Sequence, residues 1–226
     1  MNFFSKYSLE ARVFPSVLGL LPFYILQYYY LGDLFDFDFF KLEILSSISL
    51  SLVILYFFAE FPVRYIGKLY EDKIFKNKLN FPSVNFLMHS NKEYGVDFKK
   101  QIRKKIENDF SLILASEEEE IENEKEARLR IKDVVGLMIS EVRDGHLLLR
   151  QNIAYGFVRN LWAVSIIGVM TSLLLVGFSF NNNNFIFYTG VVMIVLYAAY
   201  LLCGKKVIDY FSKNYARKLI EEYYKN

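Results

Sequence analysis

Residues 161–203 read LWAVSIIGVMTSLLLVGFSFNNNNFIFYTGVVMIVLYAAYLLC and contain no Asp, Glu, Lys or Arg. Two apolar runs, 161–178 and 185–203, flank a turn of four asparagines at 181–184. Each run has roughly the 17–25 residues that a helix needs to cross a ~30 Å hydrocarbon core. The sequence therefore predicts a hairpin of two transmembrane helices.

A second apolar hairpin lies at the other end of the chain, in residues 13–31 and 42–61. The segment between its runs carries Asp33, Asp36 and Asp38 and no basic residue before Lys41. The first run is too long for the apolar region of a signal peptide and is followed at once by another, so we expect it to be retained. The predicted fold class is all-α: a polytopic membrane protein with four transmembrane helices, arranged as two hairpins that flank a helical cytoplasmic module.

The basic residues set the expected topology. Of 27 Lys and Arg residues, all but Lys41 lie outside the two hairpins. By the positive-inside rule, both termini and the middle segment of this expected multi-pass membrane protein lie in the cytoplasm. The predicted division is an N-terminal transmembrane hairpin (1–61), a cytoplasmic helical module (62–160), a C-terminal transmembrane hairpin (161–203) and a cytoplasmic basic tail (204–226).

Three features of the apolar runs bear on function. Pro22, in the middle of the first run, predicts a kink near residues 18–21. The second run carries a series of hydroxyls that are candidates for lining a pore, with ordinary helix packing as the alternative: Ser46, Ser47, Ser49 and Ser51. The third run has small residues that predict close helix contacts, within or between subunits: Ser165, Gly168 and Ser172.

The middle segment is predicted to be largely helical. Residues 64–78 carry an apolar stripe, 79–90 have the composition of a loop, and 98–114 form a basic amphipathic helix. The bases of that helix are candidates for contact with lipid headgroups or another anion, a nucleotide or nucleic acid included: Lys99, Lys100, Arg103, Lys104 and Lys105. Ser116 and Glu119 form a capping-box pattern that predicts the start of a long helix.

The junction that leads into the third run is the sharper candidate for a ligand site. A helix is expected to begin at His146 and to continue into the membrane without a Gly or Pro break between residues 157 and 161. A signal bound at this end could then move the transmembrane segment. The candidate ligand or gating residues are Arg143, His146, Arg150, Gln151 and Asn152.

Catalytic chemistry finds little support in the sequence. One cysteine, Cys203, and two histidines, His89 and His146, do not provide a zinc ligand set, and no phosphate loop or nucleophile motif occurs. We expect no enzyme activity, no cofactor and no metal. No apolar run carries a charge near its centre, which disfavours a secondary transporter and is compatible with a passive pore gated by apolar side chains.

Two apolar hairpins around a helical module give the chain a layout that resembles the small multi-span effector and accessory membrane proteins of bacterial anti-phage systems, linked to CRISPR or to cyclic-nucleotide signalling. The resemblance implies a homo-oligomeric pore or membrane-perturbing effector, gated through the cytoplasmic module, in antiviral defence. The alternative is a membrane-anchored adaptor whose acidic run, residues 117–126, recruits a soluble protein. Expected partners are membrane lipids, further copies of the chain, and a nucleotide or nucleic-acid signal or a soluble effector protein.

Overall fold

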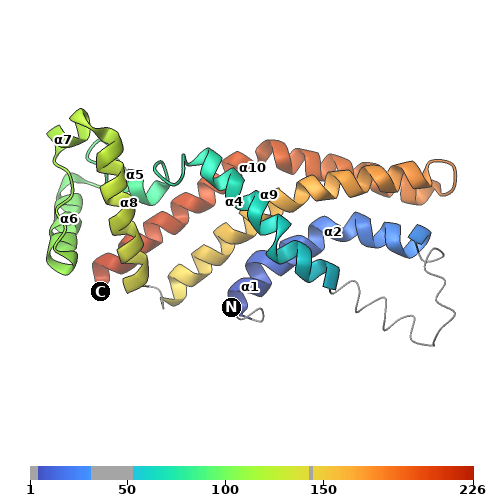
Figure 1. The fold of residues 1–226 in the computed structure, drawn as a ribbon, viewed down its shortest axis with the longest axis horizontal. Coiled ribbons are helices and arrows are strands. Elements are labelled where there is room, and N and C mark those ends of the chain that lie inside the picture. Colours follow the sequence, from blue (N-terminus) through green and yellow to red (C-terminus); the bar gives the residue numbers. More distant parts are fainter. Residues whose placement is uncertain (1–4, 32–52, 143–144) are drawn as a thin grey trace. The chain divides into compact units, whose positions relative to one another are not determined.

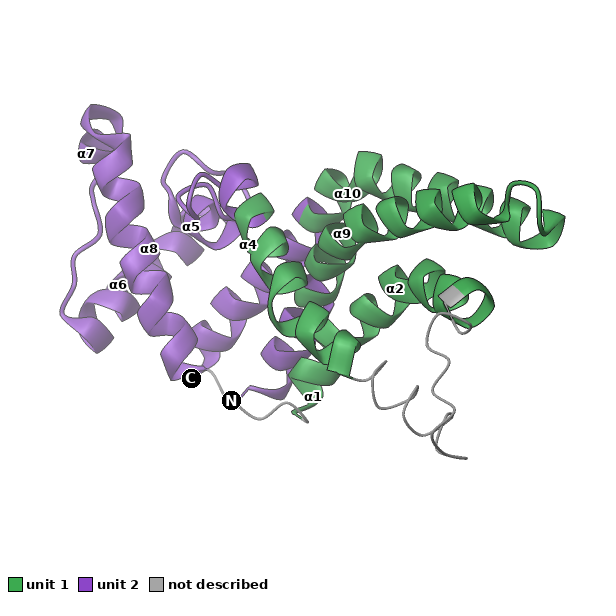
Figure 2. Cartoon of the chain, turned by 45° about the vertical axis from the view of Figure 1, so that its right-hand side comes forward, with its two compact units in different colours: residues 1–70, 156–208 green, residues 71–155, 209–226 purple. Residues whose placement is uncertain are grey.

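The computed structural model describes residues 5–31, 53–142 and 145–226, and within these ranges every regular element is a helix (Figure 1). The chain divides into two compact units (Figure 2). Unit 1 contains residues 1–70 and 156–208, and unit 2 contains residues 71–155 and 209–226. Each unit is thus assembled from two separate pieces of the chain.

Unit 1 contains helices of membrane-spanning length. The first runs through α1 (Lys6–Ser8), the π-helical turn η1 (Leu9–Val13), α2 (Phe14–Leu26) and a second π-helical turn, η2 (Gln27–Leu31). The others are α9 (His146–Ser179) and α10 (Asn184–Lys225), both of which also extend into unit 2. Three helices of the described chain, Lys6–Tyr30, α9 and α10, are long and apolar enough to cross a membrane.

These three helices confirm the first, third and fourth predicted spans, whereas four spans were expected. Of the second predicted span, residues 42–52 lie outside the described residues, as do the hydroxyls proposed to line a pore: Ser46, Ser47, Ser49 and Ser51. Residues 53–60 are helical and lead into α4 (Pro62–Ile74). The described residues therefore form a helical chain with three candidate spans, and the prediction of four spans is supported only in part.

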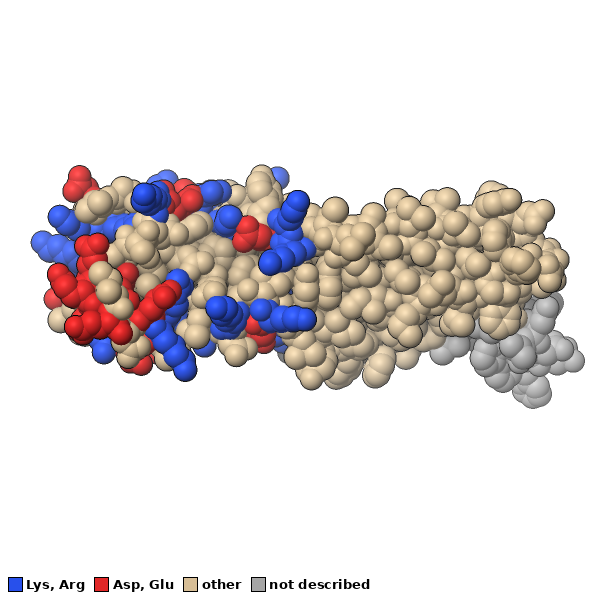
Figure 3. Space-filling view, turned by 90° about the horizontal axis from the view of Figure 1, so that it is seen from above, with Lys and Arg blue, Asp and Glu red and all other residues tan. Residues whose placement is uncertain are grey.

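The surface of the apolar helices carries large exposed side chains and no charge between residues 161 and 204. Figure 3 shows a wide area without Lys, Arg, Asp or Glu. Among the exposed residues are Met170, Leu173, Leu174, Phe178, Val192, Val195 and Leu196. Continuous apolar area of this kind is rare on soluble proteins, so unit 1 has the surface expected of helices in a lipid bilayer.

The small residues of the third predicted span lie at contacts within one chain. Ser165 and Ser172 are buried, and a Cβ placed on Gly168 would lie within 3.0 Å of the Tyr197 ring of α10. Trp162 of the same helix stacks on Tyr70 of α4 with ring centroids 3.4 Å apart. Close packing of α9 therefore serves the interior of unit 1.

Unit 2 is formed by α5 (Pro82–Leu87), α6 (Val96–Phe110), α7 (Glu117–Glu122), α8 (Glu124–Glu141) and parts of α9 and α10. The prediction of a loop over residues 79–90 was wrong at α5. Pro82 suits the first position of a helix, where its missing N–H is not needed, and Val84, Phe86 and Leu87 are buried. Burial of these side chains outweighs the local breaker composition.

The capping box at Ser116 is confirmed: its hydroxyl accepts from the Glu119 N–H, and the Glu119 carboxylate accepts from the Ser116 N–H. The long helix predicted to follow it is interrupted at Asn123, which leaves helical geometry and caps α8 by accepting from the Glu126 N–H. The apolar face of α8 then supplies Ile131, Val134 and Met138 to the core.

Residues 204–226, predicted as a separate basic tail, continue α10 to Lys225, and residues 209–226 belong to unit 2. Leu219, Ile220 and Tyr223 are fully buried. The Tyr223 hydroxyl donates to Asp109 Oδ2 at 2.8 Å, and the Tyr224 hydroxyl donates to Gln101 Oε1 at 2.5 Å. The end of α10 is therefore a core element packed on α6.

Candidate functional site

A buried ion pair joins the first helix to the segment before α4. Arg12 Nη1 lies 2.7 Å from Glu60 Oε1 and 3.0 Å from Glu60 Oε2, with side chains 10% and 8% exposed. The Ser8 hydroxyl donates to the same carboxylate at 3.4 Å, and the half-exposed Arg64 guanidinium lies 3.7 Å from it. Glu60 lies near the end of the second predicted span, where a carboxylate could reach the membrane interface. Helix pairing instead turns it inward, where only a paired carboxylate is tolerated.

A second polar contact lies beside Pro15. In an α-helix the N–H of residue 15 would donate to the carbonyl of Ala11, but proline has no N–H. The Asn160 side chain, fully buried on α9, donates from Nδ2 to the Ala11 carbonyl at 2.6 Å. An amide of a neighbouring helix thus satisfies a backbone group that proline leaves without its usual partner.

The same arrangement recurs at Pro22, seven residues further along the same helix. This residue lies inside α2 and leaves the Leu18 carbonyl without its i+4 donor. The Tyr197 hydroxyl of α10 donates to that carbonyl at 2.6 Å. The Tyr197 ring lies against Gly168, where a larger residue would displace it. The first helix is therefore held at its two prolines by one side chain from α9 and one from α10.

We call Arg12, Glu60, Asn160 and Tyr197, with the backbone of Ala11 and Leu18, the proline-clamp site. It joins the first helix to three other helical segments of unit 1. The sequence shows the prolines and predicts the kink, but it does not identify the donors. It does show which backbone groups need a donor, because the carbonyls at positions 11 and 18 lie four residues before the two prolines.

Unit 2 has a polar core of its own around α6. Lys99 Nζ donates to the carbonyls of Met88 and His89 at 2.9 and 3.1 Å and contacts the Asn91 carbonyl. Burial lowers the pKa of Lys99, and the nearby Arg103 lowers it further. The ammonium therefore closes the turn after α5.

Arg103 and Glu120 form the charged centre of this core. Arg103 Nη2 lies 2.6 Å from Glu120 Oε1 and 2.9 Å from the Leu87 carbonyl, and Nη1 donates to the Ala115 carbonyl at 2.6 Å. The other oxygen of Glu120 accepts from the His89 N–H at 2.7 Å. Burial lowers the pKa of Arg103, and the contact with Glu120 opposes that shift. One ion pair thus joins α5, α6 and α7.

The structure separates the five bases proposed to contact lipid or an anion. Lys99 and Arg103 face inward, as described above. Lys100 and Lys104 are exposed, and Lys105 lies 3.2 Å from Asp109 and over the Tyr223 ring. This leaves two free-standing surface bases on α6 in place of a cluster of five.

The proposed ligand or gating residues at the start of α9 are placed in part. His146 and Arg150 are exposed, Gln151 and Asn152 are half-buried, and Arg143 lies outside the described residues. A Cβ on Gly145 would collide with the Glu222 carboxylate of α10, so the start of α9 packs closely against that helix. The structure thus puts His146 and Arg150 on one accessible face, four residues apart.

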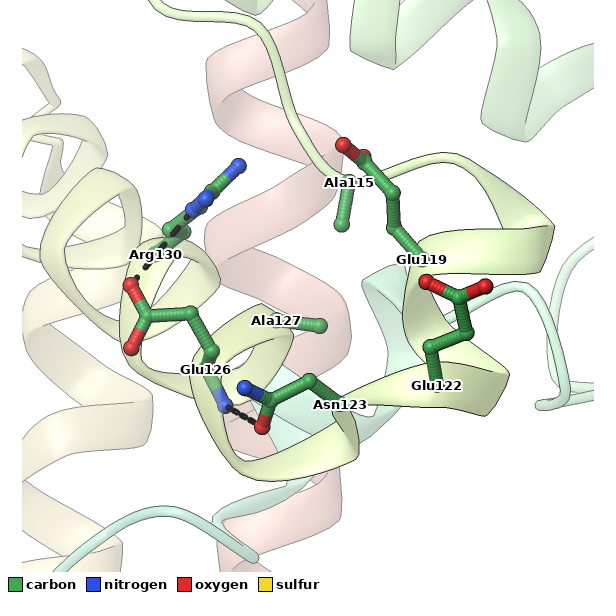
Figure 4. Close-up of a pocket in the computed structure, with 7 residues that line it drawn as sticks. All are labelled: Ala115, Glu119, Glu122, Asn123, Glu126, Ala127 and Arg130. Atoms are coloured by element: carbon green, nitrogen blue, oxygen red, sulfur yellow. Dashed lines mark hydrogen bonds and ion pairs between the residues drawn. The ribbon is translucent and has the colours of Figure 1, made fainter.

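The acidic run forms one side of a shallow pocket in unit 2 (Figure 4). Three carboxylates, Glu119, Glu122 and Glu126, line it with Arg130, which pairs with Glu126 at 3.6 Å. The side chain of Ile121, on α7, is 80% exposed. Among the described residues, no group of three or more His, Cys, Asp or Glu side chains is arranged to hold a metal ion.

The chain matches no protein-family profile, no curated protein and no solved structure.

Proposed function

We propose that this chain forms a homo-oligomeric pore in a bacterial inner membrane, opened by movement of its charged unit. The observation that supports this most directly is the proline-clamp site. Asn160 and Tyr197, which hold the first helix, belong to α9 and α10, and these two helices continue without interruption into unit 2. A displacement of either helix would thus change how the first helix is held.

The proposed mechanism uses the weakness that proline introduces. The π-helical turns η1 and η2 flank α2, and Pro22 lies within it, so the first helix has fewer of the regular i+4 hydrogen bonds that stiffen a span. While Asn160 and Tyr197 donate to its carbonyls, the helix is fixed. When α9 or α10 moves, the carbonyls are released and the helix bends at Pro22.

The remaining parts of the proposal follow from the membrane setting. Four spans per subunit, arranged as two hairpins, enclose little space for water, so the aqueous path lies between copies of the chain. Both termini and unit 2 lie in the cytoplasm, where a nucleotide or nucleic-acid signal binds near Arg143, His146 and Arg150. The proposed biological role, antiviral defence by loss of the membrane barrier, is what the resemblance to anti-phage membrane effectors implies.

Dye release from liposomes that contain the purified protein tests this function. Asn160→Leu and Tyr197→Phe should each raise dye release in the absence of any signal, because each removes one hold on the first helix. Tyr200→Phe is the matched control: its hydroxyl also donates to a backbone carbonyl, that of Val158, but no proline is involved. Absence of release from every variant and from the unmodified protein, under every condition tried, would contradict a pore. Equal release from all of them would contradict the role of the proline-clamp site.

A membrane-anchored adaptor is the second candidate, and one observation favours it. Ile121 projects from α7 among Glu117, Glu118 and Glu122, which gives unit 2 an exposed apolar side chain within an acidic surface. Such a surface suits a basic amphipathic helix of a soluble protein. Absence of dye release together with loss of partner binding in Ile121→Glu would favour the adaptor.

A further inference from the structure

The segment that leads into α4 and α4 itself carry an exposed apolar ridge. Val53, Phe57, Phe61, Tyr65 and Leu69 follow one another at intervals of four residues, and their exposed fractions are 64%, 54%, 59%, 66% and 52%. Residues four apart lie above one another on a helix, so these side chains form a single row. The row continues from the apolar segment into a region that contains charges.

The charged residues beside this row are sorted by sign. Both acids of residues 53–71 face inward: the Glu60 side chain is 8% exposed and Glu71 is buried. Both bases, Arg64 and Lys68, are exposed on the side of the row. Up to Leu69 the outer face of this helix is therefore apolar and positive; the half-buried Asp72 and the exposed Lys73 follow in the last turn of α4.

Contacts of the opposite face of α4 show which part of α9 lies beside it. Val63 packs on Ala163 and Val164 of α9, and Gly67 lies against Asn160. This is where α9 changes character, because Arg159 precedes and the charge-free run 161–204 follows. Trp162 also packs against Gly204, directly before Lys205 and Lys206 of α10. The row thus crosses the level at which unit 1 passes from uncharged to charged surface.

We propose that this face of α4 binds anionic phospholipid headgroups. The aromatic rings of Phe57, Phe61 and Tyr65 lie at the boundary between acyl chains and headgroups, and Arg64 and Lys68 contact the phosphates. The proposal depends on insertion of unit 1 in a membrane and does not depend on pore formation. It assigns lipid contact to α4, whereas sequence reasoning assigned it to the bases of α6.

Charge distinguishes lipid from a second copy of the chain as the occupant. If two copies met through this face across a two-fold axis, the Arg64 and Lys68 side chains of one would face the same bases of the other, without any exposed acid of this segment to pair with them. An anionic headgroup complements both bases, and its acyl chains complement the apolar row. The observed sorting of charge therefore favours lipid.

Trp162 provides a direct probe, because it is the only tryptophan of the chain and stacks on Tyr70 of α4. The protein, purified in an uncharged detergent, is titrated with short-chain phosphatidylglycerol and, in parallel, with phosphatidylcholine, while the fluorescence of Trp162 is followed. We expect saturable binding of phosphatidylglycerol, weakened about fivefold by Lys68→Gln and about 25-fold by Arg64→Gln with Lys68→Gln, the factor of about five per base that ~1 kcal/mol implies.

The control variant is Lys100→Gln with Lys104→Gln, which removes two exposed bases from α6 and should leave binding unchanged. Arg64 also lies 3.7 Å from Glu60, so a change at Arg64 could disturb that ion pair. The single change Lys68→Gln leaves the pair in place and therefore tests lipid binding alone. Equal binding of both lipids, or an equal loss in the α6 variant, overturns the proposal. A change in the native mass of the protein upon Tyr65→Ser, with phosphatidylglycerol binding intact, would assign the face to a second copy instead.

Discussion

Both units use polar side chains to satisfy backbone carbonyls, but they use different chemistry. In unit 1 the donors are neutral: the amide of Asn160, the hydroxyls of Tyr197 and Tyr200, and the indole of Trp162, which donates to the Leu201 carbonyl at 3.2 Å. In unit 2 the donors that serve several carbonyls at once are the charged groups of Lys99 and Arg103. Charge is costly in lipid, so a membrane helix is joined by neutral donors where a water-facing unit can use cations.

The pair of Arg12 and Glu60 is the exception in unit 1, and removal of one partner should have the largest effect. Glu60→Ala leaves Arg12 buried beside an apolar interior, and we expect a loss of about 3 kcal/mol in the free energy of unfolding. Glu120→Ala in unit 2 should cost less, about 2 kcal/mol, because Arg103 keeps the carbonyls of Leu87 and Ala115. Unfolding in detergent followed by circular dichroism compares the two.

A double variant shows whether the cost of Glu60→Ala arises from an unpaired charge. Arg12→Leu with Glu60→Leu replaces the whole pair with apolar groups, and its stability should return to within about 1 kcal/mol of the unmodified protein. If the double variant is as unstable as Glu60→Ala, then shape and not charge makes the pair important, and the contrast between the units is weaker than stated.

A smaller effect is expected at the second proline. Tyr197→Phe should cost about 1 kcal/mol, because it removes the donor to the Leu18 carbonyl. Pro22→Ala supplies a backbone N–H for the same carbonyl, so in that background Tyr197→Phe should cost much less. A coupling energy near zero in this double-mutant cycle would show that Tyr197 does not compensate for the proline.

The smallest effect is a pH dependence in unit 2. The Tyr223 hydroxyl holds the pKa of Asp109 below its ordinary value of 3.8, with Lys105 contributing. A depressed carboxyl pKa adds stability at pH values above 3.8 and loses it as the pH falls through the folded-state pKa. The unfolding midpoint should therefore fall slightly more between pH ~5 and ~2 in the unmodified protein than in Tyr223→Phe. Parallel curves for the two proteins would show that this contact adds nothing.

Hydropathy and local signals predicted much of the fold. The charge-free run 161–203, the start of α9 at His146 and the capping box at Ser116 each depend on residues close in sequence, and all are present in the structure. Helix α5 was missed because burial of Val84 and Phe86 decides it. The break at Asn123 was missed although asparagine is a favoured N-cap residue. Helices were therefore predicted correctly where residues close in sequence determine them.

The candidate site was predicted less well, for the same physical reason. Pro15 and Pro22 were visible as helix disruptors, but the partners of Ala11 and Leu18 are far away in the sequence, on α9 and α10. The bases of α6 were treated as one cluster, although Lys99 and Arg103 face inward because α5 and α7 offer carbonyls and a carboxylate. Which face of a helix is covered depends on tertiary contacts that composition does not contain.

The division of unit 2 into two pieces of the chain has a consequence for its biosynthesis. Residues 71–155 leave the ribosome before the apolar run 161–203, and residues 209–226 leave after it. Until then, Phe98 and Phe110 of α6 lack Tyr224 and Tyr223, the aromatic rings on which they pack. Unit 2 can therefore complete its core only after the last apolar segment has been synthesised.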